Sequence, residues 1–211
     1  MARLFRSALA DTSVASQVAE ELDRDGVVVM PTDSVYGIGA AARRGNPGHE
    51  RIFAIKGRSR SQTLPLLVGG PEDLRLYGAE VPEWACRAAC VLWPGAITFV
   101  VRASSRLADE YKAADGTVAL RVPDAPLVRA VIEKQGFPLA MTSANTHGSP
   151  SPANFEELEE AILDKVDVAV DGGRCPVGVA STIVDATGAV PRILREGVIK
   201  RDDICAAGNL R

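Results

Sequence analysis

The chain has 211 residues, of which 46% are hydrophobic and 24% charged, and its formal net charge is −3. This composition is typical of a globular domain with a sizeable core, and it excludes disordered and collagen-like chains. No apolar stretch approaches the roughly 18 residues of a membrane span, and the N-terminus lacks the apolar region of a signal peptide. Four scattered cysteines are too few for a disulfide framework, so we expect a cytoplasmic protein with no membrane contact.

Taken in chain order, the apolar spacing first predicts a helix that begins after Thr12 and Ser13 and ends at Gly26. A buried strand over 27–30 comes next, followed by a helix over 47–56 with Asn46 as its N-cap. The later predicted elements are a strand over 64–68, helical segments over 71–92, strands over 97–101 and 117–122, a helix over 124–136, a strand over 138–142, a helix over 154–163, a strand over 166–170 and a hairpin of 181–186 with 190–194. Because helices and strands interleave, we predict one α/β domain over 1–211 with an open, twisted, mixed sheet and flanking helices.

Charged residues gather in two runs. Six Arg or Lys residues and a single acid, Glu50, lie between Arg43 and Arg60, whereas seven acids and only Lys165 lie between residues 154 and 171. Each run could be a solvated face of the protein. The basic run could instead collect phosphate groups, and the polar strand ends described below favour that second interpretation.

Two nucleotide-binding motifs are excluded. The segment Gly37-Ile-Gly39-Ala-Ala-Ala42 is separated from the preceding strand by residues 31–34. The region about 20 residues further on is basic, where a dinucleotide-binding fold needs an acid for the ribose. No G-x-x-x-x-G-K-[ST] loop occurs either. We therefore expect no nicotinamide cofactor.

Cysteine and histidine are also poor candidates for chemistry. Cys86 and Cys90 lie on one predicted helix, but two thiolates do not complete a tetrahedral zinc site, so we expect buried structural cysteines and no zinc. Ser143 and His147 lack the G-x-S-x-G turn of a hydrolase. With two histidines in the whole chain, a catalytic triad is not expected.

Polar residues follow several of the predicted strands. They occupy residues 31–37 and 142–145, while 56–58 place two cations beyond a helix end, and 181–182 and Arg195 frame the final hairpin. These positions bring cations, hydroxyls and amides to strand ends, where α/β sheets bind their ligands. Such groups suit an anionic ligand with carboxylate or phosphate groups, and they include no obvious general base.

The ordered segments PTDSVYGIG, IKGR, WPGAITFVV, TVALRVPD, TSAN, STIVD and RILREG closely resemble the YrdC-like threonylcarbamoyl-AMP synthase family. The resemblance runs from about Gly26 to Val198, with all segments in order. It implies the YrdC-like fold with a basic concave active site. It also implies a nucleotidyltransferase that makes threonylcarbamoyl-AMP and pyrophosphate from L-threonine, bicarbonate and ATP, for the N6-threonylcarbamoyladenosine modification of ANN-decoding tRNAs.

The same resemblance implies roles for individual residues. The family's catalytic tetrad falls on Lys56, Arg58, Ser143 and Asn145. L-Threonine would bind Thr32, Arg121, Ser143 and Ser181. ATP would bind Arg58, Thr117, Asn145, Ser151 and Arg195, and Mg²⁺ would accompany it with no metal site on the protein itself. The physical properties agree, because Arg121 can grip a carboxylate as a fork and Lys56 can act as a point charge on a triphosphate.

The chain departs from the family pattern between residues 59 and 69. Several relatives carry KGRP, then NPL, and then a histidine that contacts threonine. This chain has KGRSRSQTLPLLVGG, with Ser59 after the arginine and Gly69 where the histidine would lie. Ser34 and Met141 also replace residues that are common in relatives. The chain further lacks the additional C-terminal domain of the longer relatives.

Two other functions are considered. A tRNA or double-stranded RNA binding module of the same fold would use the 43–60 run, but the chain is acidic overall and keeps the full tetrad. A carbamoyl-transfer module of the hydrogenase-maturation type would need acylphosphatase and zinc-finger regions, for which the chain has no room. We expect the synthase, working mainly by positioning and electrostatics, with downstream tRNA threonylcarbamoyl-transferase proteins as partners and at most weak RNA binding.

Overall fold

The computed structural model describes residues 2–7, 10–60 and 62–210. Its strands are β1 (Arg3–Arg6), β2 (Val28–Met30), β3 (Gly37–Ala41), β4 (Leu66–Leu67), β5 (Gly78–Ala79), β6 (Ile97–Ala103), β7 (Thr117–Arg121), β8 (Leu139–Ser143), β9 (Val168–Asp171), β10 (Thr182–Asp185) and β11 (Arg192–Arg195). Its helices are α1 (Ala15–Asp23), α2 (Pro47–Lys56), α3 (Asp73–Tyr77), α4 (Glu83–Leu92), α5 (Pro126–Gln135), α6 (Glu160–Leu163) and α7 (Arg201–Ala207), with 3-10 turns at Asp109–Tyr111 and Phe155–Glu157. Within these described ranges, no helix combines the length and the hydropathy of a membrane span.

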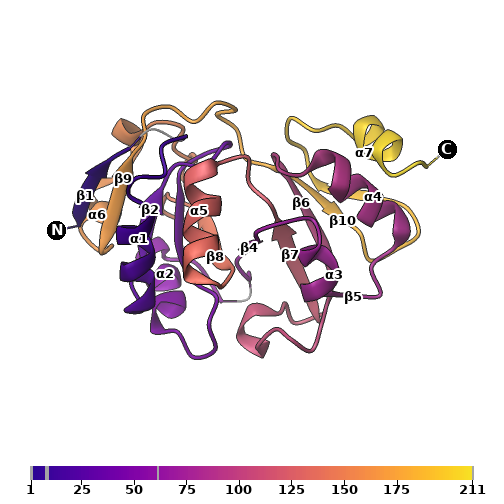
Figure 1. Cartoon of the computed structure of the whole chain (residues 1–211), viewed down its shortest axis with the longest axis horizontal. Helices are drawn as coiled ribbons and strands as arrows, with labels where there is room; N and C mark the ends of the chain where they lie inside the picture. The colour runs from indigo at the N-terminus through magenta and orange to yellow at the C-terminus, as the bar shows by residue number, and fades with distance from the viewer. Residues whose placement is uncertain (1, 8–9, 61, 211) are drawn as a thin grey trace.

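All strands belong to one mixed sheet, in the order β1-β9-β2-β3-β8-β4-β7-β6-β10-β11, with β5 paired to β6 (Figure 1). Parallel ladders join β1 to β9, β9 to β2, β4 to β7 and β6 to β10. The other pairs are antiparallel, and the predicted final hairpin is the β10–β11 pair at one edge. This arrangement confirms the predicted open mixed sheet with flanking helices.

Successive residues of the strands enter different cores, because side chains alternate between the two faces of a sheet. Val28 and Met30 of β2 pack in a core with α1 and α5, whereas Val29 belongs to a second core that includes α2 and α4. In the other half of the sheet, Phe99 of β6 and Leu120 of β7 also belong to the second core. Their neighbours in sequence point to the opposite face, where the site described below lies.

Helix N-caps follow the predictions in one case and differ in another. Asn46 caps α2 as predicted, since its side chain accepts a hydrogen bond of 2.8 Å from the first turn. The caps predicted for α1 are wrong, because the N-cap is Val14 and no side chain caps the helix. Ser13 is engaged by Asp11 instead, whose carboxylate accepts from the Ser13 N–H at 2.8 Å.

The structure fixes the places of three glycines near the first strands. Gly26 does not end α1; the left-handed residue that ends it is Asp25, with φ of 62°. Gly37 and Gly39 lie in strand β3 and not in a turn. A Cβ atom would lie 2.5 Å from the Met141 side chain at Gly37 and 2.7 Å from it at Gly39. These two glycines therefore let β3 lie against the bulky Met141 of β8.

The cysteines of α4 are not core residues. Cys86 is partly exposed and Cys90 is exposed, so the prediction of buried structural cysteines is wrong for this pair. The apolar stripe of the helix falls on other positions, and the side chains it buries are Trp84, Ala85, Ala88 and Ala89.

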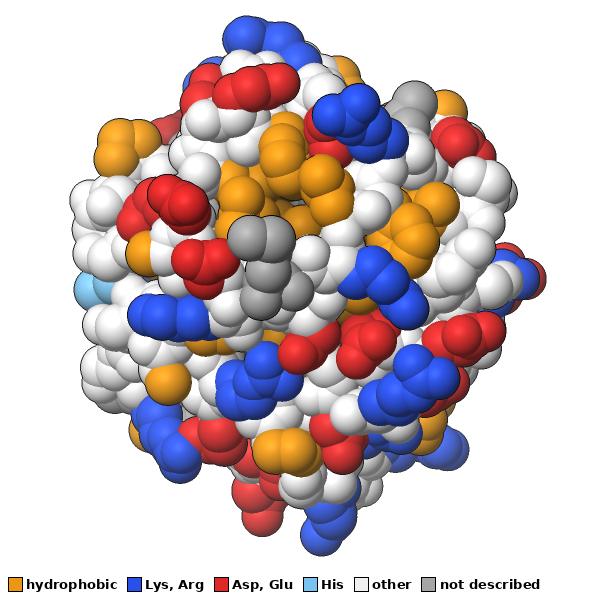
Figure 2. All heavy atoms as spheres, turned by 90° about the vertical axis from the view of Figure 1, so that its left-hand side faces the viewer, with side chains coloured by type: hydrophobic (Ala, Val, Ile, Leu, Met, Phe, Trp, Pro, Cys, Tyr) orange, Lys and Arg blue, Asp and Glu red, His pale blue; other side chains and the backbone are white. Residues whose placement is uncertain are grey.

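Some members of the basic run form ion pairs with the acidic run or with nearby acids. Arg51 pairs with Asp167 at 2.8 Å, which joins the two runs directly, and Arg43 pairs with Asp25 at 2.6 Å. Figure 2, which views the side of the molecule that carries β1, shows basic and acidic side chains interspersed. Three of the six basic side chains, Arg43, Arg51 and Arg60, are therefore in ion pairs, and Arg58 lines the cavity described next.

Candidate active site

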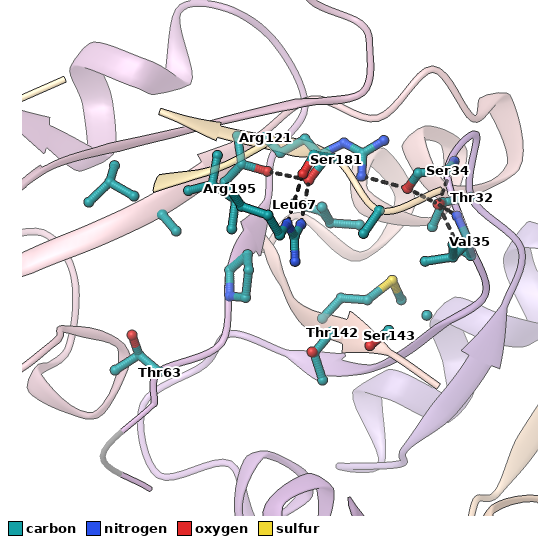
Figure 3. A pocket seen from close by; sticks show the side chains of 18 of the residues that line it. Thr32, Ser34, Val35, Thr63, Leu67, Arg121, Thr142, Ser143, Ser181 and Arg195 are labelled. Carbon is teal, nitrogen blue, oxygen red and sulfur yellow. Dashed lines mark hydrogen bonds between the residues drawn. The ribbon is translucent and has the colours of Figure 1, made fainter. Parts of the chain in front are cut away.

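A cavity of about 330 Å³ lies between one face of β6, β7, β10 and β11 and the ends of β3 and β8. The sheet wall carries Thr98 of β6 and Ala119 and Arg121 of β7, with Arg195 of β11 beside them. The facing wall carries Ser143 and its neighbours at the end of β8 (Figure 3). The alternation predicted for 117–122, which sets Ala119 and Arg121 on one face, is confirmed.

Arg121 is held from behind by internal acceptors. Its Nε donates to Gly95 O at 2.9 Å, and its terminal nitrogens donate to Ser34 Oγ at 2.8 Å and to Asp33 Oδ1 at 2.6 Å. Arg121 is 6% exposed and Asp33 is 4% exposed, so the strand arginine is paired with a buried anion. A guanidinium has five N–H groups, so one on each terminal nitrogen remains, which is what a carboxylate accepts in a bidentate pair.

Arg195 reaches the same cavity from the edge strand β11. Its Nε donates to Ser181 O at 3.0 Å and a terminal nitrogen donates to Ser181 Oγ at 3.2 Å. Ser181 Oγ is also 3.0 Å from Thr98 Oγ1, which fixes the serine between two strands. Burial, followed by the positive charges of Arg121 and Arg58, lowers the pKa of Arg195. Three guanidinium groups therefore converge on one small space.

Arg58 lies just beyond the end of α2. Gly57 adopts φ of 61° at the C-cap, a left-handed conformation that favours glycine and turns the chain away from the helix axis. The Arg58 guanidinium donates to Thr142 Oγ1 at 3.1 Å and to the backbone oxygens of Gln62 and Thr63, both at 3.2 Å. The divergent segment 59–69 therefore helps to place Arg58; residue 61 lies outside the described residues.

Lys56 is 2% exposed and does not line the cavity. Its Nζ donates to the carbonyl oxygen of Ser143, to Asn145 O at 2.5 Å and to Asn145 Oδ1 at 3.4 Å. The Asn145 amide in turn donates to Thr146 O and Ser149 O, at 2.9 and 2.7 Å. Lys56 and Asn145 thus shape the loop after β8 from behind. This arrangement directs no ammonium N–H at a triphosphate, and the role predicted for Lys56 stays a prediction.

The loop after β8 is also held from its outer side. Glu159 accepts hydrogen bonds from the Thr146 N–H, at 2.8 Å, and from the Thr146 hydroxyl. Burial, with a smaller contribution from Arg58, lowers the pKa of Lys56 to about 8, and Glu159 opposes that shift. The ammonium beneath this loop is therefore charged at neutral pH but titrates close to it.

Thr32 and Ser34 form a hydroxyl turn after β2. Thr32 Oγ1 donates to Val35 O at 2.7 Å and accepts from the Ser34 N–H at 3.1 Å. Both side chains line the cavity (Figure 3). The turn holds Ser34 Oγ in the position where it accepts from Arg121.

The structure brings most of the predicted site residues together but not all. Those that line the cavity are Thr32, Arg58, Arg121, Ser143, Ser181 and Arg195. Thr117 begins β7 and donates its hydroxyl to Asp115 at 2.7 Å, outside the lining. Ser151, in the loop before Pro152, and Gly69 also lie outside it. Their predicted roles stay predictions.

Sequence analysis assigned no role to Asp33, Thr98 or Glu159. Thr98 alternates with the core residue Phe99 on β6, so its position followed from the strand pattern. Asp33 follows a buried strand, where an acid needs a cation as partner. The Glu159 contact with the loop has no local sequence signal.

The cavity does not fit a metal ion held by the protein. None of its described lining residues is Asp or Glu, and in the described part of the chain no three or more His, Cys, Asp or Glu side chains gather as a metal site. Mg²⁺ prefers carboxylate and phosphate oxygens and keeps several waters. A Mg²⁺ ion at this cavity would therefore be bound by substrate phosphates.

These features define an α/β protein with a cavity suited to small anionic ligands on one face of a mixed sheet. The family model for Sua5/YciO/YrdC proteins, described as "Telomere recombination", matches residues 20–197. The chain therefore belongs to the Sua5/YciO/YrdC family.

Three similar curated proteins carry threonylcarbamoyl-AMP synthase in their names. Threonylcarbamoyl-AMP synthases of Pyrococcus abyssi and Bacillus subtilis are each 34% identical to this chain, over 89% and 90% of it. The alignments cover 55% of each of those two proteins, so the chain spans about half of their length. A Mycobacterium tuberculosis protein provisionally named threonylcarbamoyl-AMP synthase is 37% identical over 84% of this chain and 81% of its own. A shared synthase name does not favour an RNA-binding module without activity.

Solved structures show the same fold. P. abyssi Sua5 complexed with L-threonine matches with a TM-score of 0.90 and 30% identity, over 97% of this chain and 60% of that chain. Escherichia coli YciO matches with a TM-score of 0.86 and 26% identity, over 97% of this chain and 100% of that chain.

Proposed function

We propose that this chain is a threonylcarbamoyl-AMP synthase, a nucleotidyltransferase that uses L-threonine, bicarbonate and ATP and serves tRNA modification. The curated relatives carry that name, and one similar structure was solved with L-threonine. The observation that carries the proposal is the convergence of Arg58, Arg121 and Arg195 on one cavity whose described lining holds no carboxylate. Each substrate brings at least one anionic group, which such a cavity attracts.

Threonine would bind at the sheet wall. Its carboxylate would take the two N–H groups that Arg121 has left after its bonds to Asp33, Ser34 and Gly95. Its methyl group would lie among the apolar side chains of the lining, of which Met141 is one. A fixed fork selects a planar carboxylate, whereas a mobile cation would bind any anion.

ATP would bind toward Arg58 and Arg195, with Mg²⁺ carried on its phosphates. The threonine amine and bicarbonate condense to a carbamate with loss of water. A carbamate oxygen then attacks the α-phosphorus, the bond from this phosphorus to the bridging oxygen breaks, and pyrophosphate leaves. The arginines stabilise the negative charge of the transition state, and the cavity holds the reacting groups together. The product would pass to downstream tRNA threonylcarbamoyl-transferase proteins in the cytoplasm.

Pyrophosphate release tests this proposal. Release from ATP should require threonine and bicarbonate together, with neither sufficient alone. Serine should replace threonine with roughly fivefold lower efficiency, because a buried methyl group contributes about 1 kcal/mol. Equal release in the absence of any amino acid would contradict the proposal.

A further inference from the structure

A second cavity, of about 360 Å³, lies at the far end of β3 and β8 from the proposed active site. The two strands pair from Gly37 opposite Ser143, at the active-site end, toward their other ends. Ala42 and Pro138, just beyond those other ends, share a hydrogen bond of 2.8 Å and line the second cavity. The two cavities are thus connected by one pair of strands and have no lining residue in common.

The second cavity is lined by three arginines, and none of its described lining residues is Asp or Glu. Arg43 is committed elsewhere, because it pairs with Asp25 at 2.6 Å and donates to carbonyl oxygens at the end of α1. Arg44 and Arg106 are exposed. Neither guanidinium has a hydrogen-bond or ion-pair partner within the described ranges, so both are available to an anion.

The acids that are close to these arginines in sequence have other partners. Asp109 pairs with Lys112 at 2.8 Å, and Glu110 accepts from the Gly45 N–H at 2.6 Å. Lys112 is the main cause of the lowered pKa of Asp109, and Arg44 is the least of the causes. The charge of Arg44 is therefore largely uncompensated.

An aromatic ring lines the same cavity as the free arginines Arg44 and Arg106. Phe137 is 43% exposed, and the Arg43 guanidinium lies 5.9 Å from the centre of its ring. The apolar part of the lining also includes Leu76, which is exposed, and Tyr77. Proteins that bind single-stranded nucleic acids place a base on such a ring while nearby arginines neutralise the phosphates.

We propose that this second cavity binds a nucleoside phosphate, with the base against Phe137 and the phosphate oxygens on Arg44 and Arg106. Inorganic phosphate alone would make no contact that needs the Phe137 ring. A cationic ligand would be repelled by the three arginines. A free nucleotide and a nucleotide of a single strand present the same chemistry to this site. The proposal goes beyond the synthase activity and does not depend on it.

Fluorine NMR of the full chain tests the site directly. The chain has five phenylalanines, so fluorophenylalanine labelling gives few resonances, and Phe137→Leu identifies that of Phe137. AMP, inorganic phosphate and a short single-stranded oligoadenylate are titrated separately. We expect a saturable shift of the Phe137 resonance with AMP or the oligoadenylate and a much weaker response to phosphate. Equal responses to AMP and phosphate would overturn the role of the ring.

Charge variants separate this site from the active site. The double variant Arg44→Glu, Arg106→Glu should weaken AMP binding at Phe137 at least about tenfold, roughly the worth of one charge-assisted hydrogen bond. Arg44→Gln with Arg106→Gln checks that added acids are not the cause, and Arg201→Glu, on exposed α7, is the matched control. Pyrophosphate release should stay unchanged in all three.

The proposal is overturned if the Phe137 resonance shifts with neither AMP nor the oligoadenylate. It is also overturned if the shift in the charge variants equals that in the natural chain. Tighter binding of oligoadenylate with a steeper salt dependence identifies a strand as the ligand, and tighter binding of AMP identifies a free nucleotide.

Discussion

The two walls of the active-site cavity hold their buried cations by different means. On the sheet wall, Arg121 is paired with the buried carboxylate of Asp33 at 2.6 Å. On the loop wall, Lys56 is surrounded by neutral oxygens of Ser143 and Asn145, and burial lowers its pKa to about 8. Burial lowers the pKa of Arg121 and Asp33 opposes that shift, but an arginine remains protonated, whereas the lysine held by carbonyl groups titrates nearer to neutral pH. The cation of the sheet wall, Arg121, is therefore permanent, whereas the cation of the loop wall, Lys56, loses its charge when the pH is raised.

Removing the counter-charge of the sheet wall should have the largest effect. Asp33→Ala leaves Arg121 buried without an anion, and we expect a loss of about 3–5 kcal/mol in the free energy of unfolding, measured in urea. Asp33→Ala with Arg121→Met should recover most of that loss, because the uncompensated charge is gone. Equal losses in the single and double variants would show that the pair is not coupled.

Replacing one arginine by lysine should weaken the binding of one substrate and leave the affinity for the other nearly unchanged. Arg121→Lys keeps the charge but loses the fork, so threonine affinity should fall by roughly 1.5–3 kcal/mol while ATP affinity without threonine barely changes. Arg195→Lys should weaken ATP and spare threonine. Calorimetric titration of each ligand into each variant checks this. Parallel losses of both ligands in both variants would mean that the two arginines support the fold instead of separate subsites.

The lowered pKa of Lys56, in the loop wall, should make the free energy of unfolding depend on pH. The pKa of Lys56 is lowered from 10.5 in the unfolded chain to about 8 in the folded one. Between these values the unfolded chain binds more protons, so stability rises with pH there, by about 1.6 kcal/mol from pH 8 to pH 9.5. Below pH 8 both states are protonated, and the penalty for burying the charge is fully present. Urea unfolding across this range should show the rise in the natural chain and not in Lys56→Met; identical pH profiles would refute it.

A substitution on the outer side of the loop wall should have the smallest effect on the free energy of unfolding. Glu159→Gln removes a charged acceptor from Thr146 at the surface, and we expect a loss of about 0.5–1 kcal/mol in the free energy of unfolding. Glu156→Gln, an exposed acid in the preceding 3-10 turn, is the control. A loss in the free energy of unfolding above that of Asp33→Ala would mean that the loop, and not the sheet, anchors the site.

Sequence patterns predicted the elements whose contacts are mostly local. The helix at 47–56 and the final hairpin carry their caps and turns within the segment. Strand β1 (Arg3–Arg6) was missed because it is short and its partner, Val168 onward, is far along the chain. Strand β3 was missed because glycine and alanine have low strand propensity, and its place is set by β2 and β8 on either side. Strand β5 and helix α7 carry too few residues for a periodic signal.

Six of the ten predicted site residues line the cavity, but the contacts that hold them could not be predicted from the sequence. The family motifs named Arg121, yet Asp33 lies 88 positions away from it, and no local pattern joins the two. Lys56 was expected to face a phosphate because an ammonium suggests an anionic partner. Its acceptors are backbone carbonyls, which every residue has, so the sequence carries no mark of them.

The order of strands in the sheet also governs when the protein can fold as it is made. Strand β1 pairs with β9, Arg3 opposite Val168, so the first strand leaves the ribosome long before its partner exists. At ordinary rates of translation this interval is about 10–30 s. Arg195, on β11, emerges later still, and the cavity is incomplete until it does. The nascent chain therefore exposes unpaired strand edges for most of its synthesis, and its ligands can stabilise only a nearly finished polypeptide.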